Sequence, residues 1–114
     1  MKLLGLPEHL RFFEGAILDP QRWPIHTKTA YKILYKGPGG QLSNQEFALW
    51  YSGTTKHWHL TPADSLGFWE PAGTLLYCLA DPDSVTPEGH TEWYAFQKET
   101  NDWEAVSTVK CKAA

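Results

Sequence analysis

The sequence is poor in cysteine, since its 114 residues include only Cys78 and Cys111. Two cysteines this far apart do not form the close pair typical of a zinc site. A chain of this length can also bury a hydrophobic core without disulfides or a structural metal. Both cysteines lie in strand-like segments, where a free cysteine usually acts as a small apolar residue. We therefore expect two reduced, structural thiols, as is usual in the cytoplasm.

Long apolar runs are also missing. The opening stretch 1–6 is followed at once by Pro7 and Glu8, so it is too short for the apolar region of a secretory signal. No segment approaches the roughly 18 apolar residues that a membrane span requires. No linker rich in glycine, serine or proline divides the chain. We expect one cytoplasmic domain, residues 1–114.

Basic residues are few and unevenly placed. The chain has 10 Lys and Arg against 13 Asp and Glu, and its only arginines are Arg11 and Arg22. Residues 1–56 hold 7 basic and 4 acidic side chains, whereas residues 57–114 hold 3 basic and 9 acidic ones. Without a basic stripe, nucleic-acid binding is not expected. The acidic half suits a protein that masks a basic partner, as an inhibitor or immunity-type protein does.

Common catalytic and ligand-binding motifs are absent. There is no Gly-x-Ser-x-Gly elbow, and neither cysteine has a histidine beside it in sequence. The glycine-rich stretch 37–40 lacks the lysine and hydroxyl of a phosphate-binding loop. The acidic loop 81–92 lacks the ligand spacing of a calcium-binding EF-hand. An enzyme is therefore less expected than a binding protein.

Turn signals and alternating apolar residues predict a mainly β fold (α+β). About six mostly antiparallel strands are expected to curl into a barrel or sandwich behind one short N-terminal helix at residues 7–15. Residues 25–36 alternate as a strand, although three lysines would also line up on a helix. The expected segments are an irregular stretch at 19–24, strands at 25–36, 46–51, 56–60 and 74–79, a turn at 37–40, a helical turn at 61–64, a loop at 81–89, and a hairpin of 92–98 with 103–112.

The last expected strand, 103–112, has two distinct faces. One face carries Trp103, Ala105, Ser107, Val109 and Cys111, and the other is mostly polar or charged. Because alternate residues of a strand point to the same side, we expect the first set to point inward. The lysines of 25–36 should likewise form a solvated face.

Aromatic side chains are abundant, with six tryptophans in the chain. The doublets Trp50–Tyr51 and Trp93–Tyr94 place one ring on each face of a strand, so both rings cannot lie in the same core. Some rings should therefore face solvent, a cavity or a second subunit. The predicted ligand-binding residues are Trp50, Tyr51, Trp58, Trp69, Trp93 and Tyr94.

Two histidines flank one of these tryptophans. His57 and His59 project to the same face of a strand, whereas Trp58 projects to the other. Two imidazoles on one face can bind one metal ion, and with a carboxylate and open positions such a site suits iron, manganese or zinc. A third ligand must come from elsewhere, and the candidates are Asp64, His90, Glu92 and His26.

The order Gly53, His57, His59 and Asp64 places His-x-His after a glycine and before an acid, and Pro87-Glu88-Gly89-His90 brings a further histidine. In these motifs the chain resembles the cupins. The spacing from Gly53 to His57 is shorter than in that family, aspartate replaces the usual glutamate, and His90 directly follows Gly89. The resemblance implies a barrel in which His57, His59 and either His90 or Asp64 hold a catalytic metal ion.

Two principal functions follow from these patterns. The first is a binding or interaction domain without a cofactor, whose surplus aromatic rings form a pocket for a small apolar or aromatic ligand, or a surface for a protein partner or homodimer. The second is the cupin-like metal-dependent enzyme. The side of the strand at 56–60 that points into the core distinguishes these two functions. Histidines inside a barrel favour the enzyme, whereas Trp58 inside favours the binding domain.

Overall fold

One antiparallel sheet of nine strands dominates the computed structural model, which describes residues 1–34, 46–67, 69, 71–79, 84, 86–97 and 99–112. The mainly β prediction is confirmed, although six strands was too few. The strands are β1 (Lys2–Leu4), β2 (Ala16–Ile25), β3 (Lys28–Leu34), β4 (Phe47–Ser52), β5 (His57–Pro62), β6 (Leu76–Leu79), β7 (Trp93–Gln97), β8 (Asp102–Ala105) and β9 (Lys110–Lys112).

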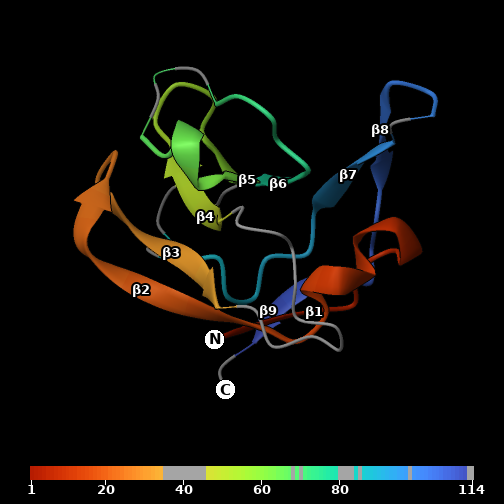
Figure 1. Cartoon of the computed structure of the whole chain (residues 1–114), viewed down its shortest axis with the longest axis horizontal. Helices are drawn as coiled ribbons and strands as arrows, with labels where there is room; N and C mark the ends of the chain where they lie inside the picture. The colour runs from red at the N-terminus through yellow and green to blue at the C-terminus, as the bar shows by residue number, and fades with distance from the viewer. Residues whose placement is uncertain are drawn as a thin grey trace.

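The strands follow one another across the sheet, with one exception. β1 to β8 form a meander, whereas β9 returns to pair with β1 at the other edge, in the order β8-β7-β6-β5-β4-β3-β2-β1-β9. Because residues 106–109 alone connect β8 to β9, the sheet must curl into a half-barrel (Figure 1). Gly5 lies at this crossing: a Cβ there would lie 1.8 Å from the carbonyl oxygen of Thr108, so only glycine fits.

The hydrophobic core lies against the inner face of the curled sheet. Its largest fully buried side chains include Trp58, Trp93, Phe13 and Leu60. The N-terminal segment 8–13 forms a 3-10 helix, η1 (Glu8–Phe13), rather than the expected longer helix, and it is kinked at Leu10. Leu6, Leu10 and Phe13 are buried in the core.

The expected irregular segment 19–24 is instead part of β2. Pro20 and Pro24 sit on either side of a register shift between β2 and β3. Proline suits an extended strand at such an irregularity, because its missing N–H costs nothing where the ladder is interrupted. The two strands are joined by a tight turn at His26 and Thr27, both with positive φ. The expected strand 25–36 therefore begins at Lys28, and Lys28 is buried rather than solvated.

The expected last strand, 103–112, is divided. Its first part, β8, pairs with β7, and its second part, β9, pairs with β1. The break at 106–109 interrupts the alternation, so Val109 and Cys111 are buried as expected, whereas Trp103, Ala105 and Ser107 are exposed. The inward assignment of those three was therefore wrong.

Smaller expectations have mixed outcomes. The helical turn expected at 61–64 is a shorter 3-10 helix, η2 (Ala63–Ser65), and Thr61 belongs to β5. The strand expected at 74–79 is β6, which begins at Leu76 and lies between β5 and β7. The turn at 37–40 and part of the loop at 81–89 lie outside the described residues. Within the described ranges, no helix has the length and apolar character needed to cross a membrane.

Candidate functional site

The central strands β4 and β5 separate the sequence motif into two faces. Tyr51 pairs with Trp58 on the inner face, and both are buried in the core. Trp50 pairs with His59, and Ser52 with His57, on the outer face. Trp58 therefore fills the half-barrel, and the two histidines lie on its outside, which is the arrangement that favours a binding protein.

The aromatic doublets are split between the faces, as predicted. Tyr51, Trp58 and Trp93 belong to the inner core. Trp50 is buried on the outer face, where it packs with Ala30, Ala48, Ile25 and Leu66. Trp69 is 73% exposed and Tyr94 is half-buried on the outer face. The six predicted ligand-binding residues are thus not brought together in one site, and four of them are buried in the two hydrophobic clusters.

A small polar network fixes the outer side of β4 and β5. The Trp50 indole N–H donates to the hydroxyl of Thr61 over 2.9 Å. His26, from the β2–β3 turn, lies 5.8 Å from the Trp50 ring between centroids, and its Nδ1 accepts from the Gly53 N–H at 2.9 Å. His26 is thereby engaged in holding the turn after β4, not in a cluster of ligands.

His59 is buried between two hydroxyl groups. Its Nε2 lies 2.7 Å from Thr55 Oγ1, and its Nδ1 lies 3.1 Å from Thr74 Oγ1. Burial, with a smaller contribution from His57, lowers the pKa of His59 to about 4. The ring is neutral at physiological pH, and both of its nitrogens are occupied. A metal ion would have to displace a threonine from this ring.

The remaining proposed ligands do not converge on the histidine pair. His57 donates from Nδ1 to the backbone carbonyl of Lys56, and Asp64 lies in η2, past the far end of β5. His90 and Glu92 lie in the segment before β7. Among the residues that the structure describes, no three His, Cys, Asp or Glu side chains are grouped to hold a metal ion.

A continuous row of rings covers the outer side of β5 to β8. We call the set His57, Tyr77, Tyr94, Phe96 and Trp103 the aromatic face. The rings of His57 and Tyr77 stack at 5.3 Å, and those of Tyr77 and Tyr94 stack at 5.0 Å with 18° between their planes. Trp103 meets Tyr77 edge-to-face at 4.8 Å and Phe96 at 5.2 Å. Cross-strand stacking thus fixes these rings before any partner binds.

Three members of the aromatic face, Tyr77, Phe96 and Trp103, were predicted neither as ligand-binding nor as metal-binding residues. Tyr77 stands between Leu76 and Cys78, and Phe96 follows Ala95, so alternation within each strand places both rings outside once the inner residues are known. Trp103 was assigned inward because one uninterrupted strand was assumed. It is 38% exposed and faces outward.

Exposed acidic residues lie on the segments that carry the aromatic face. They are Glu92 before β7, Glu99 in the turn before β8, and Asp102 and Glu104, which flank Trp103 on β8 and project to the opposite side of that strand. The described residues from 86 to 106 include five acidic side chains and no lysine or arginine. In this described stretch, the acidic side chains thus lie on the same segments as Tyr94, Phe96 and Trp103.

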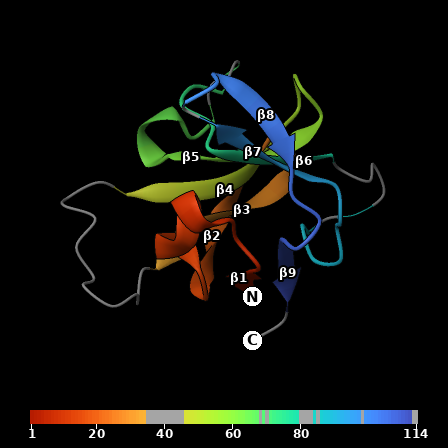
Figure 2. The same ribbon diagram turned by 90° about the vertical axis from the view of Figure 1, so that its right-hand side faces the viewer.

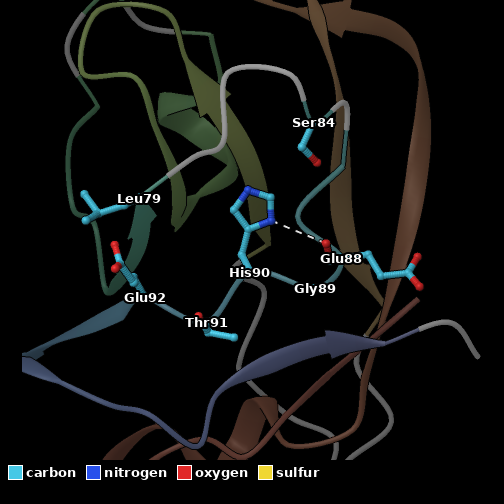
Figure 3. Close-up of a pocket in the computed structure, with 7 residues that line it drawn as sticks. All are labelled: Leu79, Ser84, Glu88, Gly89, His90, Thr91 and Glu92. Carbon is cyan, nitrogen blue, oxygen red and sulfur yellow. Dashed lines mark hydrogen bonds between the residues drawn. The ribbon is translucent and has the colours of Figure 1, made fainter.

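An open hollow of about 390 Å³ adjoins this surface. Its lining is Leu79, Ser84, Glu88, Gly89, His90, Thr91 and Glu92. Figure 3 shows the His90 ring projecting between Leu79 and Glu92 on one side and Ser84 on the other, with its Nδ1 3.4 Å from the Glu88 carbonyl. Leu79 is two residues from Tyr77 on β6, so it connects the hollow to the aromatic face.

The inner face offers less to a ligand. Trp58 is fully buried, and its indole N–H has no hydrogen-bond partner within the described part of the chain. The buried Lys28 ammonium lies 4.9 Å from the centre of the Tyr51 ring and donates to the Ser84 carbonyl. Burial raises the pKa of Cys78 and of Cys111 to about 12, so both thiols stay protonated. Both are free and buried, as expected.

Comparison with known proteins does not assign a function to this site. No family model, no curated protein and no solved structure matches this chain.

Proposed function

We propose that this chain is a binding domain without catalytic activity, and that it recognises a basic protein partner through the aromatic face. The observation that carries this proposal is the stacked row of rings on β5 to β8, together with the exposed carboxylates on β8 and on the segments next to β7. Tyrosine and tryptophan are enriched in protein interfaces, since they supply much contact area for few rotatable bonds.

Preorganisation supports a protein partner over a small flat ligand. The faces of Tyr77 are already covered, by His57 on one neighbouring strand and Tyr94 on the other. A sugar or planar ligand that stacks on a ring would have to compete with these contacts. Ring edges and phenol hydroxyls remain, and they suit an extended, mixed polar and apolar protein surface.

Charge supports a basic partner. Carboxylates at the rim of an interface attract a positively charged surface and accelerate association, and they suppress binding to acidic proteins. Glu88 and Glu92 also line the hollow beside Leu79, which suits the long apolar stem and charged tip of a lysine or arginine side chain.

The same charges disfavour a homodimer through this face. A two-fold dimer joins identical patches, so the acidic residues beside this face, Glu92 and Glu99, would be brought toward their own copies. Like charges brought together in this way oppose association. The metal-enzyme hypothesis gains no supporting observation, because both ring nitrogens of His59 already contact threonine hydroxyls.

A capture experiment with matched variants tests the proposal. The purified protein is immobilised and exposed to a lysate of the cells that produce it, together with the Trp103→Ala and Trp23→Ala variants. Trp23 is a suitable control because it is also exposed, at 73%, and lies on β2 away from the aromatic face. We expect the wild type and Trp23→Ala to retain a basic protein, and Trp103→Ala to retain about tenfold less of it.

Salt provides a second readout of the same experiment. Retention should weaken as sodium chloride rises from about 50 to 300 mM, because rim charges are screened over about a Debye length. A partner retained equally by both tryptophan variants would contradict the proposal. So would a retained protein that is acidic and insensitive to salt.

A further inference from the structure

The strand β8 forms an edge of the sheet beside the aromatic face. In the part of the chain that the structure describes, β8 is last in the strand order and pairs with β7 only. Figure 2 shows β8 at the surface, in front of β7. All four of its residues, Asp102–Ala105, are exposed. An exposed edge presents backbone groups that can pair with another strand.

Hydrogen-bond alternation identifies which backbone groups face the open side. The Val106 N–H donates to the Trp93 carbonyl at 2.9 Å, which makes this pair a hydrogen-bonded one. In an antiparallel ladder such pairs alternate with non-bonded pairs. The pairs Glu104 with Ala95 and Asp102 with Gln97 are therefore bonded to β7, whereas Trp103 and Ala105 direct their N–H and C=O groups outward.

Two contacts agree with this assignment. The Phe96 N–H, opposite Trp103, donates away from β8 to the Leu75 carbonyl at 3.0 Å. The Trp103 N–H is held at 2.7 Å by the carboxylate of Asp102 rather than by β7. The open side of β8 thus presents the backbone groups of Ala105 and the Trp103 N–H, whose bond to the Asp102 carboxylate an incoming strand can replace.

The side chains of β8 specify the chemistry of an incoming strand. Trp103 and Ala105 lie on the outer side with the aromatic face, and Asp102 and Glu104 lie on the opposite side. Directly opposed residues in an antiparallel pair share a face. The complementary strand therefore has apolar residues on one face and lysine or arginine on the other.

Pairing of β8 with the same strand of a second copy is opposed by charge. If the two-fold axis passes through Trp103, Asp102 of each copy faces Glu104 of the other. If the axis passes through Glu104, the two Glu104 side chains face each other. Like charges directly opposite destabilise a strand pair, so the edge excludes its own copy while attracting a basic strand.

We propose that β8 binds an extended segment of the basic partner as an added antiparallel strand, in which apolar and basic residues alternate. This inference rests on the proposed function and supplies the mode of recognition. Main-chain hydrogen bonds to Trp103 and Ala105 provide the register, the aromatic face receives the apolar side chains, and Asp102 and Glu104 receive the basic ones.

The test uses the full chain and a synthetic probe. The probe is an end-capped peptide of about nine residues in which lysine alternates with valine and one tyrosine, a length that covers the edge with room to spare. Residues opposite Trp103 and Ala105 use their own N–H groups to pair with β8. We expect N-methylation of the valine and tyrosine amides to weaken binding at least about tenfold, and N-methylation of the lysine amides to change it less than about threefold.

Two variants of the protein provide the reciprocal test. Ala105→Pro removes the outward N–H without removing a bond to β7, and it should weaken peptide binding by about tenfold. Ala105→Val retains the N–H and should bind within about threefold of the wild type. Thermal unfolding and the circular dichroism spectrum of Ala105→Pro should match the wild type, which separates lost pairing from lost folding.

Several results would overturn the added strand. The two methylation patterns could weaken binding equally, or Ala105→Pro could bind the peptide as well as the wild type does. The peptide could fail to bind at about millimolar concentration. Sedimentation could also show a wild-type dimer that Ala105→Pro dissociates. Loss of partner binding in Trp103→Ala alongside full binding by Ala105→Pro would retain the proposed function and reject the edge. The reverse pattern would retain the edge and reject the aromatic face.

Discussion

The two sides of β5 carry similar ring-bearing residues in different environments. On the inner side, Trp58 is enclosed by Tyr31, Tyr51 and other core residues, with its indole N–H unpaired among the described atoms. On the outer side, His57 and His59 join a series of rings and hydroxyls that reaches β8. Packing determines the inner side, whereas polar contacts and ring stacking determine the outer one. The contrast indicates that one strand contributes to both the core and the aromatic face.

The largest expected effect is at the inner side. Trp58→Ala should lower the free energy of unfolding by about 3–5 kcal/mol, because it removes a fully buried indole from a packed core. Urea denaturation followed by circular dichroism measures this change. A loss below about 1 kcal/mol would mean that the core does not depend on this side chain, and the distinction between the two sides of β5 would fail.

The next effect concerns pH and the outer side. The folded chain holds the pKa of His59 at about 4, below its ordinary value of 6.5. Between these values the unfolded chain binds a proton that the folded chain does not. With respect to this group the folded state is therefore most stable above pH 6.5, and its stability declines as the pH falls toward 4, by about 3 kcal/mol in total.

Comparison with His59→Gln isolates this contribution. Glutamine preserves polar contacts to Thr55 and Thr74 but does not titrate. Denaturation at a series of pH values should give a shallower loss of stability for the variant over this range. Parallel curves for the two proteins would show that His59 is not the residue responsible.

A smaller effect compares the two buried tryptophans directly. Trp50→Phe removes a hydrogen bond to Thr61, whereas Trp58→Phe removes an N–H without a partner among the described residues. We expect Trp50→Phe to lower the free energy of unfolding by about 1–2 kcal/mol more than Trp58→Phe does. In Trp58→Phe, removal of the unpaired buried N–H offsets part of the packing that is lost, whereas in Trp50→Phe a hydrogen bond is lost as well. Equal losses in urea denaturation would indicate that the Trp58 N–H is satisfied in solution.

The smallest effect on stability is expected at the aromatic face itself. Trp103→Ala should lower the free energy of unfolding by about 1 kcal/mol or less, because the ring is partly exposed at the sheet edge. Its effect on partner binding should be much larger than its effect on folding. If Trp103→Ala lowered the free energy of unfolding by several kcal/mol, Trp103 would belong to the structural core instead.

Local sequence patterns predicted much of the fold. Alternation at 46–51 and 56–60 correctly placed Trp58 and the histidines on opposite faces, because residue spacing along a strand is a local property. The division of 103–112 was not predictable in this way. It depends on pairing with β1 at the other end of the chain, and no local pattern records a contact of that kind.

The candidate site was less predictable than the fold. Individual rings were identifiable, but the aromatic face depends on the order of β5, β6, β7 and β8 in the sheet, which brings Tyr77 between His57 and Tyr94. The metal-ligand hypothesis relied on two histidines that do lie on one face. The hydrogen bonds of Thr55 and Thr74 to the two ring nitrogens of His59 could not be predicted, because Thr74 lies on a different segment of the chain.

The pairing of β1 with β9 also constrains how the protein acquires its shape during synthesis. Lys2 lies opposite Lys112, so this part of the sheet joins segments from opposite ends of the sequence (Figure 1). While the ribosome is still translating, β1 has no β9 to pair with, and the core lacks Val109 and Cys111. Closure of the half-barrel is therefore a late, long-range event, whereas the hairpins of the meander can form as they emerge.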